Sequence, residues 1–197
     1  MSQETTNTER LKLFSDAVFG VIITVMVLEL RPPHEHTWAA LGALWPTAVS
    51  YAVSYLFVAI VWVNHHHILQ YARVATPRLV WGNFGHLFTV SLVPFSTAWI
   101  ADSRLASVPV FIYATVFVLV NLSYIVLCVE SANVCVRDLP PRIWAMLHRR
   151  SATTLAVFAL AAVIALFSPV VGFGLICCCL LVYTRPDRSL KAEVTRG

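Results

Sequence analysis

Apolar runs of membrane-spanning length recur along this chain and limit its fold more than any other feature. About 20 helical residues cross a hydrocarbon core of roughly 30 Å. Inside lipid the backbone must satisfy its own hydrogen bonds, so each run is expected to be helical. Of the 197 residues, 58% are hydrophobic and only 12% are charged. This is about half the charged share of ordinary soluble domains. The sequence predicts an all-α integral membrane protein.

Six spans are expected in one transmembrane domain over residues 1–197. The first covers about residues 11–30 and ends at the helix-stopping "RPPHEH". The next three cover about residues 38–64, 79–101 and 108–129. A polar connector, "ESANVCVRDLPPRIWAMLHRR", precedes an apolar block with room for two short spans that turn at Ser168 and Pro169. The polar start "MSQETTNTER" lacks the pattern of a cleaved signal peptide, so the first apolar run is expected to be part of the mature protein.

Basic residues test the number of spans, because cytoplasmic loops collect Lys and Arg. With the N-terminus inside, all 14 basic residues except Arg31 and Arg104 fall on the cytoplasmic side. Five spans would put the C-terminal basic cluster on the wrong side. We therefore expect a multi-pass protein of the cell membrane with both termini cytoplasmic. This distribution accounts for the net charge of +4 without a nucleic-acid partner.

The first span has one narrow apolar stripe when it is drawn as a helix at about 100° per residue. Four residues make up the stripe: Ala17, Val21, Val25 and Leu28. Gly20 and Thr24 lie beside it. A helix with one such stripe cannot enclose a pathway alone, so an oligomer is required if the stripe lines one.

Two carboxylates, Asp16 and Glu29, interrupt the same span, although charge within a membrane is costly. Asp16 lies nearly opposite the stripe, roughly 7 Å inside the cytoplasmic boundary. Asn83 and His86 reach a similar depth on the third span, so we expect a side-chain network of Ser15, Asp16, Asn83 and His86. A structural bond between helices is the preferred role for Asp16, and a direct role in moving ions or protons is the alternative.

The start of the first span carries the pattern R-x-x-x-F-S-D, formed by Arg10, Phe14, Ser15 and Asp16. "TVM" follows at residues 24–26, and "LVPFSTAW" lies at residues 92–99 of the third span. With the six-span layout, these residues resemble the potassium channels related to the lysosomal transmembrane protein 175. The resemblance covers about the first 130 residues.

This resemblance implies a homotetramer of six-span subunits, whose first helices line one central pore for potassium ions. No cofactor is implied. The family builds its constriction from apolar side chains spaced i, i+4 and i+7 along the first helix, which correspond to Val21, Val25 and Leu28 here. A hydroxyl ring beside the constriction corresponds to Thr24. Val21 is smaller than the isoleucine or leucine usual at the first ring.

A constriction of this kind would select ions without a stack of backbone carbonyls, because no TVGYG filter sequence is present. An apolar ring can dewet and block ions without closing, and its widening would admit water and a partly hydrated ion. Potassium sheds its hydration shell more easily than sodium, so moderate potassium selectivity is expected.

The outer end of the span carries Glu29, which lies about 80° from the stripe where its side chain can reach water. Glu29 and Glu35 could raise the local cation concentration at an outer mouth. Arg31 is near enough to offset part of that charge. A solvated pair whose side chains extend to water is the preferred interpretation, and a cation-concentrating ring is the alternative.

Three consecutive histidines, His65, His66 and His67, invite a metal-site interpretation. Two ligands on one helix face need i, i+3 or i, i+4 spacing, so no metal site is predicted. We expect these histidines at the cytoplasmic interface, where they could respond to pH.

The five cysteines show no pairing pattern and are expected to be free thiols that act as small apolar side chains.

An enzyme and a transporter are the competing classes of function. Ser15, Asp16 and His86 lack a G-x-S-x-G context, so an enzyme is not predicted. The stronger alternative is a proton-coupled secondary transporter that uses the intramembrane groups Asp16, Glu29 and His86. Such transporters often contain internal repeats, and none is evident between the two halves of this chain.

Overall fold

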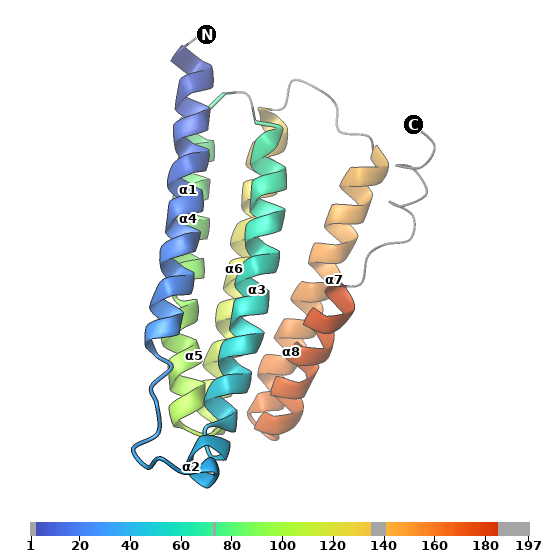
Figure 1. Ribbon diagram of the computed structural model, residues 1–197. Helices are drawn as coiled ribbons and strands as arrows, with labels where there is room; N and C mark the ends of the chain where they lie inside the picture. The colour runs from blue at the N-terminus through green and yellow to red at the C-terminus, as the bar shows by residue number, and fades with distance from the viewer. Residues whose placement is uncertain (1–2, 73, 135–140, 185–197) are drawn as a thin grey trace, which may run out of the picture.

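The computed structural model describes residues 3–72, 74–134 and 141–184, and every regular element in these ranges is a helix (Figure 1). The helices are α1 (Gln3–Leu28), α2 (Trp38–Gly42), α3 (Trp45–Gln70), α4 (Pro77–Ser91), α5 (Val93–Asp102), α6 (Ser107–Asn133), α7 (Pro141–Ala165) and α8 (Pro169–Tyr183). Seven residues that entered the sequence predictions lie outside the described ranges: Arg73, Cys135, Arg137, Arg185, Arg188, Lys191 and Arg196.

Four helical segments of the described chain are both long enough and apolar enough to cross a membrane: Asn7–Leu28, Trp45–Gln70, Pro77–Asp102 and Ser107–Asn133. These agree with the first four expected spans. The apolar helix α8 is shorter, with 15 residues. The all-helical membrane fold is therefore as predicted, whereas six spans remain a proposal.

Prolines move several helix boundaries away from the expected ones. The second span was expected from residue 38, but α3 begins at Trp45 because Pro46 fits only the first turn of a helix. The separate short helix α2 precedes it. Pro94 likewise divides the third span, so α4 ends at Ser91 and α5 begins at Val93. Pro141 begins α7 inside the expected polar connector, whose second part is therefore helical and continuous with the next apolar run.

The core lies where α3, α6 and α7 meet. The Phe57 ring stacks on Phe117 at 3.6 Å between centroids, and Phe158 meets Phe57 edge-on at 5.9 Å. A buried chain of hydroxyls joins three helices nearby: Thr97 donates to Ser54 at 2.7 Å, and the Ser54 and Tyr113 hydroxyls are 2.8 Å apart. Lipid provides no hydrophobic drive for helices to associate, so this packing and hydrogen bonding hold the bundle together.

The described cysteines are free thiols on α6 and α8, namely Cys128, Cys177, Cys178 and Cys179. Cys128 is buried against Tyr124, and Cys177 and Cys179 pack partly against the core. Their positions agree with the prediction of small apolar side chains.

Close contact between α7 and α8 depends on Gly172. A Cβ atom at this position would lie 2.8 Å from the Ala161 carbonyl oxygen and 3.0 Å from the Ala165 Cα. Both neighbours are backbone atoms, which cannot move aside as a flexible side chain can. Small residues allow such close approach between membrane helices.

Replacing Gly172 with alanine should therefore lower the thermal midpoint of the detergent-solubilised protein. Overpacking of this kind costs about 1 to 3 kcal/mol. Gly174 is the matched control, because a Cβ there meets nothing within 4 Å. Thermal unfolding of both variants measures the difference, and an equal effect of the two alanines would contradict the close α7–α8 contact.

Candidate functional site

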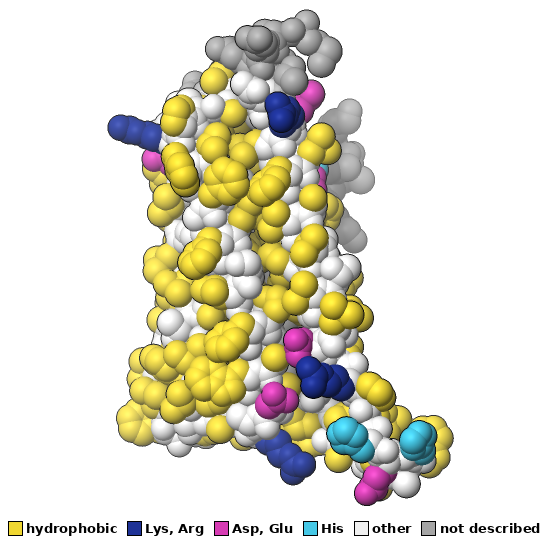
Figure 2. Space-filling model, turned by 90° about the vertical axis from the view of Figure 1, so that its left-hand side faces the viewer, with side chains coloured by type: hydrophobic (Ala, Val, Ile, Leu, Met, Phe, Trp, Pro, Cys, Tyr) yellow, Lys and Arg dark blue, Asp and Glu magenta, His cyan; other side chains and the backbone are white. Residues whose placement is uncertain are grey.

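Helix α1 has one face buried in the bundle and one face left open. The buried face carries Ser15, Phe19, Ile22 and Met26, which pack toward α3 and α4 or lie in the main core. The predicted stripe lies on the open face, where Val21 is 59% exposed, Val25 40% and Leu28 77%. Figure 2 shows this side of the molecule, with hydrophobic side chains over most of its height and charged side chains mainly near the two ends. The apolar stripe is thus without cover in the single subunit.

Thr24 lies on the open face beside the stripe. Its hydroxyl donates a hydrogen bond of 2.8 Å to the Val21 carbonyl oxygen, one turn earlier. This bond uses the hydroxyl proton, so the oxygen lone pairs point away from it. Thr24 therefore offers an acceptor oxygen on the same face as the apolar side chains.

A buried polar cluster behind α1 links three helices through Ser15, Asn83 and His65. The Asn83 amide donates to the Ser15 hydroxyl at 3.0 Å, and the Ser15 hydroxyl donates to the Leu11 carbonyl at 2.9 Å. The Asn83 carbonyl oxygen accepts from His65 Nε2 at 2.7 Å, which requires the proton on that nitrogen. All three side chains are at most 1% exposed. The cluster fixes the rotation of α1 against α3 and α4.

His65 was expected at the membrane interface with its two neighbours, and the structure instead buries it in this cluster. His65 follows Val61 by four residues and precedes Ile68 by three, so it shares the buried face of α3 with both. The sequence alone does not separate it from His66, because apolar residues lie at the same two spacings from His66. His66 is partly buried and His67 is exposed. No group of three or more potential metal ligands is found among the described residues.

His86 extends the cluster toward α6. Its ring is parallel to the His65 ring within 10°, with centroids 5.6 Å apart. His86 Nδ1 lies 2.9 Å from the Ser123 hydroxyl, which also bonds Thr89 at 2.8 Å. Of the four expected network members, Ser15 and Asn83 are in contact, and His86 joins them through His65.

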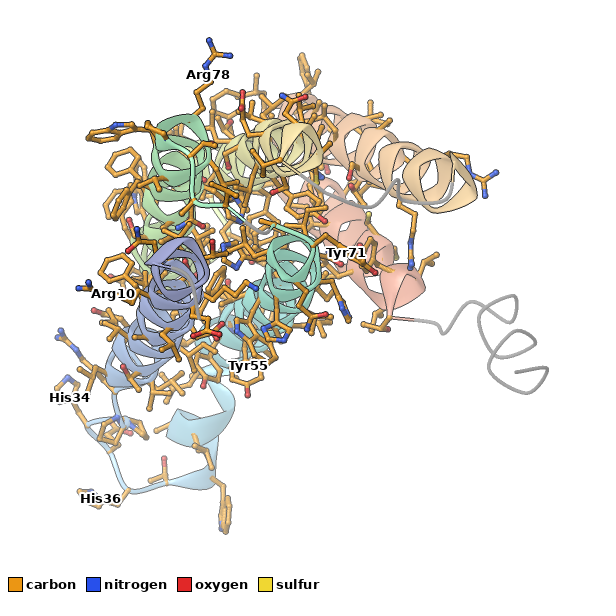
Figure 3. All side chains as sticks on the ribbon, turned by 90° about the horizontal axis from the view of Figure 1, so that it is seen from above. Arg10, His34, His36, Tyr55, Tyr71 and Arg78 are labelled. Carbon is orange, nitrogen blue, oxygen red and sulfur yellow. The ribbon has the colours of Figure 1, made fainter. Side chains whose placement is uncertain are left out.

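Asp16 lies on the flank of α1 next to α3 and takes no part in the hydrogen bonds of the Ser15 cluster. Its Oδ1 accepts a 2.8 Å hydrogen bond from the Trp62 indole. The expected bond between helices is therefore present, but its partner is Trp62 in place of Asn83 or His86. Phe14 packs edge-on against Phe84 of α4 at 5.5 Å. Arg10 lies at the surface of α1, as the view along the bundle shows (Figure 3).

The opposite end of α1 borders a cavity of about 190 Å³ against α3 and α5. Glu29, Arg31 and Asp102 contribute charged groups to its lining, and Tyr51 and Thr97 add hydroxyls. Glu29 and Arg31 are exposed. Glu29 is 13 residues from Asp16, which corresponds to roughly 20 Å along the helix.

The fold and the site together define an all-helical membrane protein whose first helix leaves an apolar row and a threonine uncovered. The family model for the endosomal/lysosomal potassium channel TMEM175 matches residues 10–94. A potassium channel of Chryseobacterium sp. is 30% identical over 187 residues, which are 94% of this chain and 96% of that protein. The chain belongs to the TMEM175 family, as its sequence predicts.

Two further comparisons agree with this assignment. A potassium channel of Streptomyces collinus is 35% identical over 123 residues, or 58% of this chain and 60% of that protein. The crystal structure of a lysosomal potassium-selective channel TMEM175 homolog from Chamaesiphon minutus has the same fold, with a TM-score of 0.78 at 23% identity. The match covers 90% of this chain and 96% of that one. Membership in a channel family is in line with the prediction that the chain is not an enzyme.

Proposed function

We propose that this chain forms a potassium channel in the cell membrane, in which the α1 helices of four subunits surround one central pore. The uncovered row of Val21, Val25 and Leu28 supports this proposal most directly. Three large apolar side chains in line, on a helix whose other face is buried, need either lipid or further copies of the chain to cover them. The relatives that match this chain are named as potassium channels, which favours the pore.

The constriction in this proposal is apolar, with Thr24 as a polar ring one turn from Val21. Rings of valine and leucine give a cation no ligand, so a narrow ring loses water and blocks ions until it widens. The Thr24 oxygen can replace part of the water that a passing ion loses, because its hydroxyl proton is held by the Val21 carbonyl. Selectivity for potassium over sodium should then be moderate.

The remaining side chains of α1 act as supports in this arrangement. Ser15 and Asn83 hold the helix in its rotation, and Asp16 ties its flank to Trp62. Arg10 and Phe14 lie near the cytoplasmic end of α1, before its apolar row begins. Glu29 lies at the outer mouth, beside Arg31. Six spans with both termini cytoplasmic follow from the positions of the basic residues.

A proton-coupled transporter would need Asp16, Glu29 and His86 to exchange protons along one path. Asp16 and Glu29 lie roughly 20 Å apart along α1, and His86 is buried behind the Ser15 cluster. These positions favour the channel over the transporter.

Purified protein in liposomes should therefore conduct potassium down its gradient without net proton movement. Potassium flux should exceed sodium flux by several-fold, and the detergent-solubilised particle should have the mass of four chains. A flux assay with potassium, sodium and caesium, run with a pH-sensitive dye inside the vesicles, measures this directly. A saturable flux locked to proton movement, or a monomeric particle, would overturn the proposal.

A further inference from the structure

A groove of about 650 Å³ runs between α7 and α8, on the side of the bundle away from α1 (Figure 3). The function proposed above does not use it. The lining of the groove is basic at one end and more apolar farther along. Arg149, Arg150 and Tyr183 lie at one end, and Val157 and Leu175 lie farther along the two helices.

The basic end is organised around Tyr183. Arg150 donates to the Tyr183 carbonyl oxygen at 3.2 Å, and its guanidinium carbon lies 4.4 Å from the centre of the Tyr183 ring. These contacts fix the Arg150 head at the rim of the groove. Arg149 is exposed beside it. Arg149 and Arg150 are the charged side chains in the described lining, and guanidinium groups are complementary to an anion such as a phosphate diester.

The rest of the groove is complementary to an acyl chain. Val157 follows Arg149 by eight residues, and Leu175 precedes Tyr183 by eight, so the apolar lining extends roughly 12 Å beyond the arginines along both helices. The basic end also lies at the depth of the expected membrane boundary. Asn64, where the second span was expected to end, donates to the Tyr183 hydroxyl at 2.8 Å.

We propose that this groove binds an anionic phospholipid of the cytoplasmic leaflet, with its phosphate at Arg149 and Arg150 and one acyl chain between α7 and α8. Basic pockets between membrane helices on the cytoplasmic side are known to hold anionic head groups. The proposal rests on the proposed function in one respect: α1 facing the central axis leaves α7 and α8 toward the lipid. Lipid binding is measured without ion flux, so the two proposals can fail separately.

The test titrates the purified protein in detergent with phosphatidylglycerol or phosphatidylcholine of identical acyl chains and counts bound lipids by native mass spectrometry. The wild-type protein should retain phosphatidylglycerol preferentially. An arginine near an anionic membrane surface contributes roughly fivefold in affinity, so Arg149→Gln should weaken phosphatidylglycerol binding by roughly fivefold and the double change with Arg150→Gln by roughly 30-fold. Phosphatidylcholine binding should hardly change. Arg78→Gln, at an exposed arginine in the first turn of α4, is the matched control and should behave as wild type.

A second variant tests the apolar half of the groove and leaves both arginines in place. Val157→Trp should fill the space for the acyl chain and reduce phosphatidylglycerol binding at least as much as the double arginine change. Unchanged binding in this variant would mean that the arginines act by surface charge alone, and the groove proposal would fail.

Three further outcomes would also overturn the proposal. The first is an equal loss of phosphatidylglycerol in the Arg78→Gln control. The second is full displacement of the lipid by inorganic phosphate at equal concentration, which would indicate a phosphate site. The third is a changed subunit number in the Arg149→Gln protein with lipid binding intact, which would mean that a second copy covers the groove.

Discussion

Asparagine in place of both Val25 and Leu28 should raise potassium flux into liposomes by at least about tenfold. Both side chains belong to the uncovered row on α1, and in the proposed tetramer they meet at the axis. An apolar ring excludes ions by losing its water, and an amide ring holds that water in place. Lowering the barrier by only about 1.4 kcal/mol gives a tenfold change in rate. Flux per reconstituted particle, followed with a potassium-sensitive dye, measures the effect.

Matched controls for this experiment lie on α7 and α8. Val163 is 55% exposed and Leu181 is 62% exposed, so they resemble Val25 and Leu28 in type and exposure but lie far from α1. Asparagine at these two positions should leave the flux unchanged, provided that the particle keeps its mass. An equal rise in both double variants would show that the polar groups disturb the bilayer, and Val25 and Leu28 could not then be the constriction.

The stripe on α1 could be predicted from the sequence because helical periodicity depends on residue spacing alone. Val21, Val25 and Leu28 share one face in any regular helix, whatever packs behind it. Which face the bundle leaves open is a separate matter. It depends on the buried residues Phe19, Ile22 and Met26, which contact other helices.

The polar cluster could be predicted only in part, because its members come from different helices. Ser15 and Asn83 were matched by depth, and the structure places them in hydrogen-bond contact. The depth of a residue in the membrane does not show which flank of α1 faces which neighbouring helix. The rotation of α1 determines that Asp16 faces Trp62 on α3. His65 was missed because three consecutive histidines suggested an interface, and apolar residues flank His65 and His66 at the same spacings.

Replacing Asn83 with leucine should produce the largest loss of stability among single changes near α1. Leucine is of similar size but supplies neither the amide that donates to Ser15 nor the oxygen that accepts from His65. The His65 Nε2–H group would then be buried without a partner, which costs about 1 to 3 kcal/mol beyond the lost hydrogen bonds. We expect a total of roughly 2 to 4 kcal/mol, seen as a lower thermal midpoint in detergent and a smaller yield of assembled particles.

A double variant distinguishes this polar bond from simple packing at the same place. Leucine at both Asn83 and His65 removes the donor together with its acceptor, and replacing both partners by apolar groups can be nearly neutral. The double variant should therefore be more stable than the sum of the two single changes predicts, by about 1 kcal/mol or more. Strictly additive thermal data would mean that the 2.7 Å contact between His65 and Asn83 contributes nothing specific, and the cluster would then hold α1 by shape alone.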